Sequence, residues 1–98
     1  MPLFLVNARD KANSLDLRMS VRPTHLEWAA EHAHKVRAGG PVFAEDGETF
    51  IGSTSIVEFD SLQDAKDWFA SDPYVKADLF ESVEIVPFKW SFGEGKPE

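Results

Sequence analysis

Apolar residues in this chain fall into two kinds of pattern. Short continuous or alternating runs, which are typical of strands, cover residues 3–6, 41–44, 51–59 and 83–90. Spacings of three and four residues, which are typical of amphipathic helices, dominate between the first and second runs and again between the third and fourth. The pattern therefore predicts the element order β-α-β-β-α-β, in two similar halves without a sequence repeat.

Pro23 complicates the first helical stretch. A proline inside a helix costs about 3 kcal/mol, whereas at the first helical position it costs almost nothing. We therefore expect a short helical turn over residues 14–19, a break near Arg22, and a main helix from Pro23 to about Ala38. The Gly-Gly-Pro sequence at 39–41 is expected to end that helix, because glycine readily adopts the left-handed conformation of a helix cap.

Turn and cap residues mark the remaining boundaries. Asp46-Gly47 is a turn signal, which predicts that the second and third strands form a hairpin. Gly52 indicates a bulge or a close approach of two backbones, and Ser61 is expected to cap the second helix. Pro87 has no backbone N–H, so it places part of the last strand at a sheet edge or in a bulge.

The predicted elements form one small α+β domain over residues 1–92, followed by a polar tail at 93–98 that we expect to be disordered. A four-stranded antiparallel sheet would carry both helices on one face. Its other face then needs a cover, because a domain of 98 residues buries only a modest core. A second copy, packed sheet against sheet, is the simplest cover and predicts a homodimer.

Composition narrows the class of protein and of partner. The net charge of −7 and a pI near 4.8 repel phosphate backbones, so nucleic acid is not an expected partner. The chain has no cysteine, which excludes disulfides, thiolate metal sites and thiol nucleophiles. The apolar run at 3–6 is too short for a signal segment or a membrane span, so we expect a soluble, cytoplasmic protein. Three Trp and eight Phe favour an aromatic interface or pocket.

Three histidines are candidates for acid–base or metal chemistry. His25 lies early in the main helix and off its apolar stripe, so it is either a general acid or base or an ordinary helix-edge residue. His32 and His34 fit solvated helix positions. His25 and His32 would stand roughly 10 Å apart on one helix, which is too far to chelate a single ion, and no metal site is predicted.

Other polar residues could complete a site. Because proline disfavours helical geometry at the residue before it, Asp72 should stand at a helix end, where its carboxylate either reaches a partner or caps the turn. Tyr74 follows at once and either packs or makes a polar contact. Arg18 and Arg22, one turn apart, could bind an anionic substrate group or pair with carboxylates of the chain. Ser53 could present its hydroxyl to a pocket, although the segment lacks the glycines and lysine of a phosphate loop.

Five short motifs, taken in order, resemble the YciI-like (YCII-related) family. They are Arg-Pro-Thr-His-Leu at 22–26, Gly-Gly-Pro at 39–41, Gly-Ser-Thr at 52–54, Ser-Asp-Pro-Tyr-Val at 71–75 and Val-Pro-Phe at 86–88. The resemblance implies a ferredoxin-like, dimeric α+β barrel similar to muconolactone isomerase. It also implies enzymes that pair a histidine with an aspartate at the active site, and these roles match His25 and Asp72. The segment 43–50 is shorter and more acidic than in many relatives, which would alter the pocket rim.

The combined expectation is an enzyme that uses no cofactor and transfers protons on a small molecule. His25 and Asp72 would form the catalytic dyad, with Arg22, Ser53 and Tyr74 binding the substrate. Isomerisation, lactone chemistry and hydrolysis all suit such an acid–base pair. Two alternatives stay open: a non-catalytic dimeric module that binds a small molecule or assists another enzyme, and an oxygenase, cofactor-independent or haem-handling, of the dimeric α+β barrel type.

Overall fold

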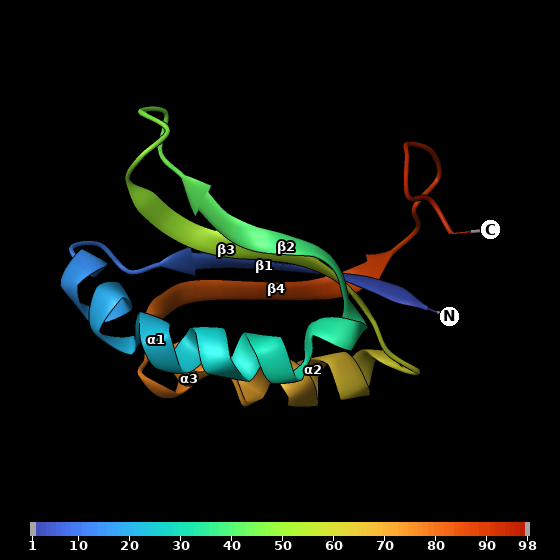
Figure 1. The fold of residues 1–98 in the computed structure, drawn as a ribbon, viewed down its shortest axis with the longest axis horizontal. Coiled ribbons are helices and arrows are strands. Elements are labelled where there is room, and N and C mark those ends of the chain that lie inside the picture. The colour runs from blue at the N-terminus through green and yellow to red at the C-terminus, as the bar shows by residue number, and fades with distance from the viewer. Residues whose placement is uncertain (1, 98) are drawn as a thin grey trace.

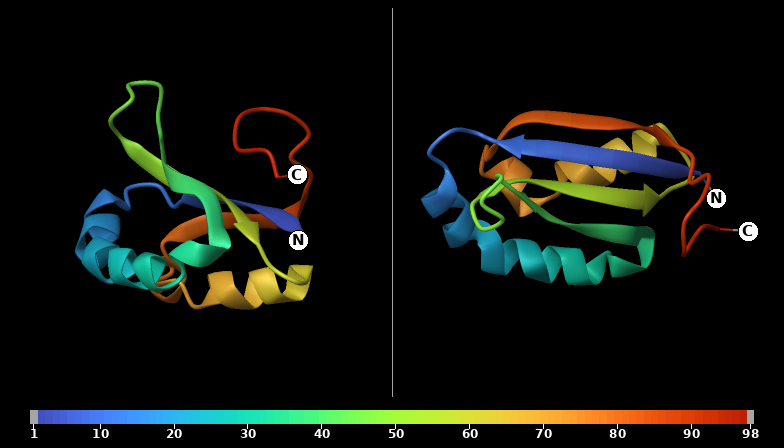
Figure 2. Two further views of the ribbon diagram at one scale, coloured as in Figure 1. Left: turned by 45° about the vertical axis from the view of Figure 1, so that its right-hand side comes forward. Right: turned by 90° about the horizontal axis from the view of Figure 1, so that it is seen from above.

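The first strand, β1 (Leu3–Asp10), lies inside a four-stranded antiparallel sheet in the computed structural model, which describes residues 2–97. The other strands are β2 (Val36–Phe43), β3 (Phe50–Glu58) and β4 (Phe80–Phe88). The helices are α1 (Leu15–Glu31), the 3-10 turn η1 (Ala33–Lys35), α2 (Leu62–Ala70) and the short α3 (Pro73–Lys76). The sheet order is β2-β3-β1-β4, and the helices lie against one face (Figures 1 and 2). The predicted ferredoxin-like arrangement is confirmed, with α3 as an addition.

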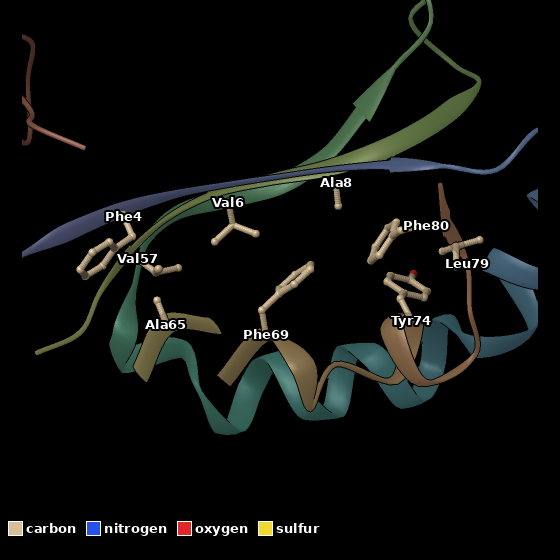
Figure 3. Packing of buried hydrophobic residues seen from close by; sticks show 9 residues of the cluster. All are labelled: Phe4, Val6, Ala8, Val57, Ala65, Phe69, Tyr74, Leu79 and Phe80. Atoms are coloured by element: carbon tan, nitrogen blue, oxygen red, sulfur yellow. The ribbon is translucent and has the colours of Figure 1, made fainter. Parts of the chain in front are cut away.

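Alternation along β1 directs every second side chain towards the helices. Phe4, Val6 and Ala8 point from this strand into the layer between sheet and helices, where they are buried (Figure 3). The rest of the buried cluster comes from the other elements: Val57, Ala65, Phe69, Tyr74, Leu79 and Phe80. Burial of each large apolar side chain stabilises the fold by about 1.5–3 kcal/mol, so this layer is the main source of stability.

The first helix differs from its prediction. α1 is a single helix over Leu15–Glu31 that contains Pro23, so the predicted break and restart there are wrong. Both halves of the helix are tied to the rest of the fold, since Arg18 donates hydrogen bonds to β3 and His25 contacts Asp72. These tertiary contacts outweigh the local cost of about 3 kcal/mol that an internal proline carries.

The predicted end of the first helix is also wrong. Residues 33–35 form η1, and residues 36–43 form β2. This strand therefore starts well before the strand predicted at 41–44. Gly39 pairs with Ser55 of β3, and a Cβ added at Gly39 would stand only 3.0 Å from the Ser55 Cβ. The glycine therefore permits close packing of strand on strand rather than capping a helix.

Several local predictions are confirmed. Ser61 caps α2 by accepting a backbone N–H of the first turn at 3.1 Å. Gly47 adopts a φ of +73° in the β2–β3 hairpin turn. A Cβ on Gly52 would stand 2.2 Å from the Ala8 carbonyl oxygen, so β3 needs glycine there. Pro87 lies in β4, an edge strand.

The first and last strands have other ends than predicted. β1 continues past the predicted residue 6 to Asp10, and β4 runs from Phe80 to Phe88 rather than from 83 to 90. The disorder of the tail at 93–98 stays a prediction, and Glu98 lies outside the described residues. Among the described helices, none is long and apolar enough to cross a membrane.

Candidate active site

His25 of α1 and Asp72, which precedes α3, meet across the molecule. The His25 Nδ1 and the Asp72 Oδ1 are 2.8 Å apart, although 47 residues separate them in the sequence. Asp72 also caps α3, because the same oxygen accepts the Tyr74 backbone N–H at 2.9 Å. Pro73 occupies the first helical position and Asp72 has extended backbone geometry, as expected for a residue before proline. The capping role and the partner role considered for Asp72 therefore coexist.

The surroundings of His25 fix its ring. The Asp72 carboxylate is buried, with 1% of the side chain exposed, and as an acceptor it calls for a proton on His25 Nδ1. The Tyr74 ring stacks on the imidazole with centroids 4.0 Å apart and planes 18° from parallel. The other ring nitrogen, Nε2, takes part in no hydrogen bond within residues 2–97. It is the nitrogen available to a ligand.

The Tyr74 ring contacts both the His25 imidazole and the buried Arg18 guanidinium. Its side chain is buried in the core, and the Arg18 guanidinium carbon stands 4.7 Å from its ring centroid. Burial raises the pKa of Tyr74 above its ordinary 10.0, and the positive charges of Arg18 and Arg22 oppose this shift. The phenol is therefore neutral across the physiological range. The Tyr74 ring packs against the His25 imidazole and does not line the cavity described below.

Arg18 is held at three points. Its Nε donates to Asp10 Oδ2 at 2.9 Å, and one terminal nitrogen donates to the Gly52 carbonyl and to Ser53 Oγ, both at 2.7 Å. Only 3% of the Arg18 side chain is exposed. Of the two roles left open for Arg18, the structure shows the ion pair with a carboxylate of the chain, Asp10. The contact with Ser53 links it to the candidate site.

A cavity of about 520 Å³ opens between α1, η1, α2 and the strands β2 and β3. His25 and Asp72 lie on its wall, and Ser53 lies on the sheet side. Trp28 and Trp68 form an aromatic wall, with ring centroids 5.0 Å apart, and the Trp28 indole N–H donates to Ser71 Oγ at 2.9 Å. The cavity is a largely apolar pocket with a few polar groups, as is typical of small-molecule sites.

The structure separates the predicted site residues into two groups. His25, Asp72 and Ser53 all line the cavity. Tyr74 lies behind His25, and Arg22 is exposed; neither lines the cavity. Sequence reasoning did not foresee that Arg18, one turn before Arg22, turns inward to the sheet.

No metal-binding group emerges in the described part of the chain. Within residues 2–97, no cluster of three His, Cys, Asp or Glu side chains could hold an ion. His32 packs its ring against Trp28, with centroids 5.2 Å apart, and His34 is exposed on η1. The polar side chains on the cavity wall include the His25 imidazole, the Asp72 carboxylate and the Ser53 hydroxyl.

The same fold occurs in solved structures of other proteins. The 5-chloro-2-hydroxyhydroquinone dehydrochlorinase TftG from Burkholderia phenoliruptrix, solved in complex with 2,5-dihydroxybenzoquinone, matches with a TM-score of 0.80 at 27% identity, over 97% of this chain and 99% of that one. Protein Atu4242 from Agrobacterium tumefaciens matches with a TM-score of 0.56 at 21% identity, over 96% and 98%. The second likeness concerns the fold alone.

Sequence comparison gives the family. Protein YciI of Escherichia coli and that of Shigella flexneri are each 41% identical over 97 residues, which cover 92% of this chain and 99% of the relative. An uncharacterized protein of Haemophilus influenzae is 40% identical over 98 residues, with 91% and 98% covered. The YCII-related domain matches residues 2–89. The chain therefore belongs to the YCII-related family.

Proposed function

We propose that this protein is an enzyme in which His25 and Asp72 form an acid–base dyad acting on a small molecule bound in the cavity. The observation that carries the proposal is the contact of 2.8 Å between Nδ1 and the buried carboxylate on the cavity wall. A carboxylate in this position fixes the tautomer of the ring and stabilises the imidazolium that forms when the ring takes a proton. The second nitrogen, Nε2, then removes and returns the substrate proton.

The remaining predicted residues take supporting roles in this proposal. Ser53 contacts the substrate from the sheet side, and Arg22 attracts an anionic substrate from the exposed surface of α1. Tyr74, which we expected to bind substrate, acts through His25 by holding the plane of the ring. The chemistry needs no cofactor, because proton transfer uses only groups already in the cavity.

The substrate is a small, flat ring compound. The cavity of about 520 Å³ is walled by Trp28 and Trp68, whose faces can stack on a planar ring. TftG, the structural neighbour, acts on a chlorinated hydroxyhydroquinone. In such an elimination a base removes a proton while chloride departs, which is a task for an imidazole. Isomerisation and lactone chemistry on similar rings need the same proton transfers.

We further propose that the protein works as a cytoplasmic homodimer. Leu5, Ile56 and Val86 lie opposite one another in the sheet register, on the face away from the helices, and all three are half-buried in the single chain. A second copy packed on this face would complete their burial. Sedimentation equilibrium of the wild type tests this, with a purely monomeric protein contradicting it.

Solvent proton exchange is a sharp test of the catalytic proposal. The protein is incubated in D₂O with a set of lactones, enolisable acids and chlorinated hydroxyhydroquinones, and NMR follows deuterium entering the substrate as well as product formation. His25→Ala is compared with His34→Ala, an exposed histidine outside the cavity that serves as the control. The proposal expects exchange by the wild type and by His34→Ala and none by His25→Ala.

The other outcomes distinguish the alternatives. A compound that raises the unfolding temperature without exchange or turnover would identify a binding module instead of an enzyme. Exchange that survives in His25→Ala would remove the dyad from the mechanism. A visible absorption band of the purified protein would indicate haem and favour the oxygenase alternative.

A further inference from the structure

The Ser53 hydroxyl carries a proton that makes no hydrogen bond within residues 2–97. Arginine only donates hydrogen bonds, so in the contact with Arg18 at 2.7 Å the Ser53 oxygen is the acceptor. No acceptor for the Ser53 O–H occurs among the described residues. Because Ser53 lines the cavity, that proton is available to a ligand.

The arginine behind this hydroxyl makes it a stronger donor than an ordinary serine. A hydrogen bond from a cation to the oxygen polarises the O–H bond, and such chains strengthen one another in a low-dielectric interior. Arg18 is also held in place, because it donates to Asp10 and to the Gly52 carbonyl as well and its side chain is buried. The donor is therefore preorganised, as groups that stabilise developing charge must be.

The neighbouring hydroxyls lack this arrangement. Thr54 donates its hydroxyl to Asn7 Oδ1 at 2.9 Å, so its proton is already engaged. Ser55 lines the same cavity but has no hydrogen-bonded cation within residues 2–97. Of the three successive hydroxyl residues on β3, only Ser53 combines a free proton with a buried positive charge behind it.

We infer that the Ser53 hydroxyl, polarised by Arg18, donates to a carbonyl oxygen of the substrate, and that the substrate is a small planar conjugated carbonyl compound. This inference rests on the proposed function, because it assigns the second half of the site that contains His25. His25 Nε2 takes a proton from the substrate, the electron pair of the broken bond moves through the conjugated system, and negative charge develops on the carbonyl oxygen. Ser53 stabilises that charge by its hydrogen bond and keeps its own proton. The imidazolium then returns the proton to another atom.

Binding of 2,5-dihydroxybenzoquinone, a flat ring with carbonyl oxygens, tests the inference directly. Its affinity is measured by calorimetric titration for the wild type, Ser53→Ala, Ser53→Thr and Ser55→Ala. We expect Ser53→Ala to weaken binding by roughly tenfold or more, the typical effect of losing a hydrogen bond to a partly charged group. Ser53→Thr keeps a hydroxyl and should retain most of the affinity. Ser55→Ala should change the affinity by less than about threefold.

Vibrational difference spectroscopy of the bound quinone adds a readout that a purely structural effect would not move. A donor on the carbonyl oxygen lowers the carbonyl stretching frequency, so the shift should be present in the wild type and Ser55→Ala and absent in Ser53→Ala. Equal effects of Ser53→Ala and Ser55→Ala on affinity and frequency would overturn the inference, as would a wild type that does not bind the quinone at millimolar concentration. Neither result touches proton exchange by His25, so a failure of this inference is distinct from a failure of the proposed function.

Discussion

Replacement of Asp72 separates its structural role from its chemical role. In Asp72→Ala, α3 loses its N-cap, which costs about 1 kcal/mol. The His25 Nδ1–H also loses its acceptor in a largely buried place, which costs about 1–3 kcal/mol more. The expected loss of unfolding free energy is therefore about 2–4 kcal/mol, a large share of the 5–15 kcal/mol typical of a domain.

Asp72→Asn is the matched variant. Its amide oxygen can still accept from the Tyr74 N–H and from His25 Nδ1, so the loss of unfolding free energy should stay near about 1 kcal/mol. The negative charge that would stabilise an imidazolium is gone, and the proposed proton exchange should fall sharply although the protein folds. Urea unfolding followed by circular dichroism gives both free energies. Equal losses in the two variants, or a loss below about 1 kcal/mol for Asp72→Ala, would refute this reading of the contacts.

Three further predictions concern the cavity wall, the core and the hairpin. Gly39→Ala places a Cβ only 3.0 Å from the Ser55 Cβ on the cavity wall, so it should weaken quinone binding in a calorimetric titration. Gly40→Ala is the control, because its Cβ meets no atom within 4 Å and the affinity should not change. Tyr74 is the only tyrosine, and burial raises its pKa, so phenolate absorbance should appear above pH 10.0 in the folded protein and near 10.0 in urea. Above pH 10.0 the folded state keeps a proton that the unfolded state has lost, so the free energy of unfolding should fall as the pH rises above 10.0. Below pH 10.0 Tyr74 should cause no such fall, and Tyr74→Phe should remove it above pH 10.0. An NMR titration should give Asp46 a pKa of about 2, because hydrogen bonds from Thr49 lower it from 3.8. Thr49→Val should raise that pKa, and a value near 3.8 in the wild type would contradict the turn geometry.

The sequence predicted element types well because its periodicities are strong. The central run at 3–6 and the amphipathic stretch after Ser61 each gave the right element. The hairpin turn followed from Asp46-Gly47, where a backbone conformation with positive φ is required. These signals are local, so a single sequence carries them.

The errors arose where distant contacts outweigh local preference. Pro23 indicated a helix start, but the contacts of Arg18 with β3 and of His25 with Asp72 hold one continuous helix. Gly39 indicated a helix end, but its role is to let β2 pack closely on β3. Neither partner is adjacent in sequence, so periodicity and propensity could not reveal them.

The candidate site was predictable in part. The pairing of His25 with Asp72 came from the family resemblance rather than from spacing, because 47 residues separate the two. Arg18 was considered only together with Arg22, since the sequence cannot tell which of two arginines one turn apart faces the sheet. Only one feature of the sequence pointed to the aromatic wall: Trp28 lies one helical turn after His25. Its stacking on Trp68 could not be predicted from that position.

The tautomer of His25 tests the central claim most directly. NMR of protein with isotopically labelled histidine resolves the two ring nitrogens, and His25→Ala assigns the signals among the three histidines. We predict that neutral His25 carries its proton on Nδ1, held by Asp72, and that Nε2 is unprotonated and responds to a ligand in the cavity. A neutral ring protonated on Nε2, with no change in Asp72→Asn, would contradict the account.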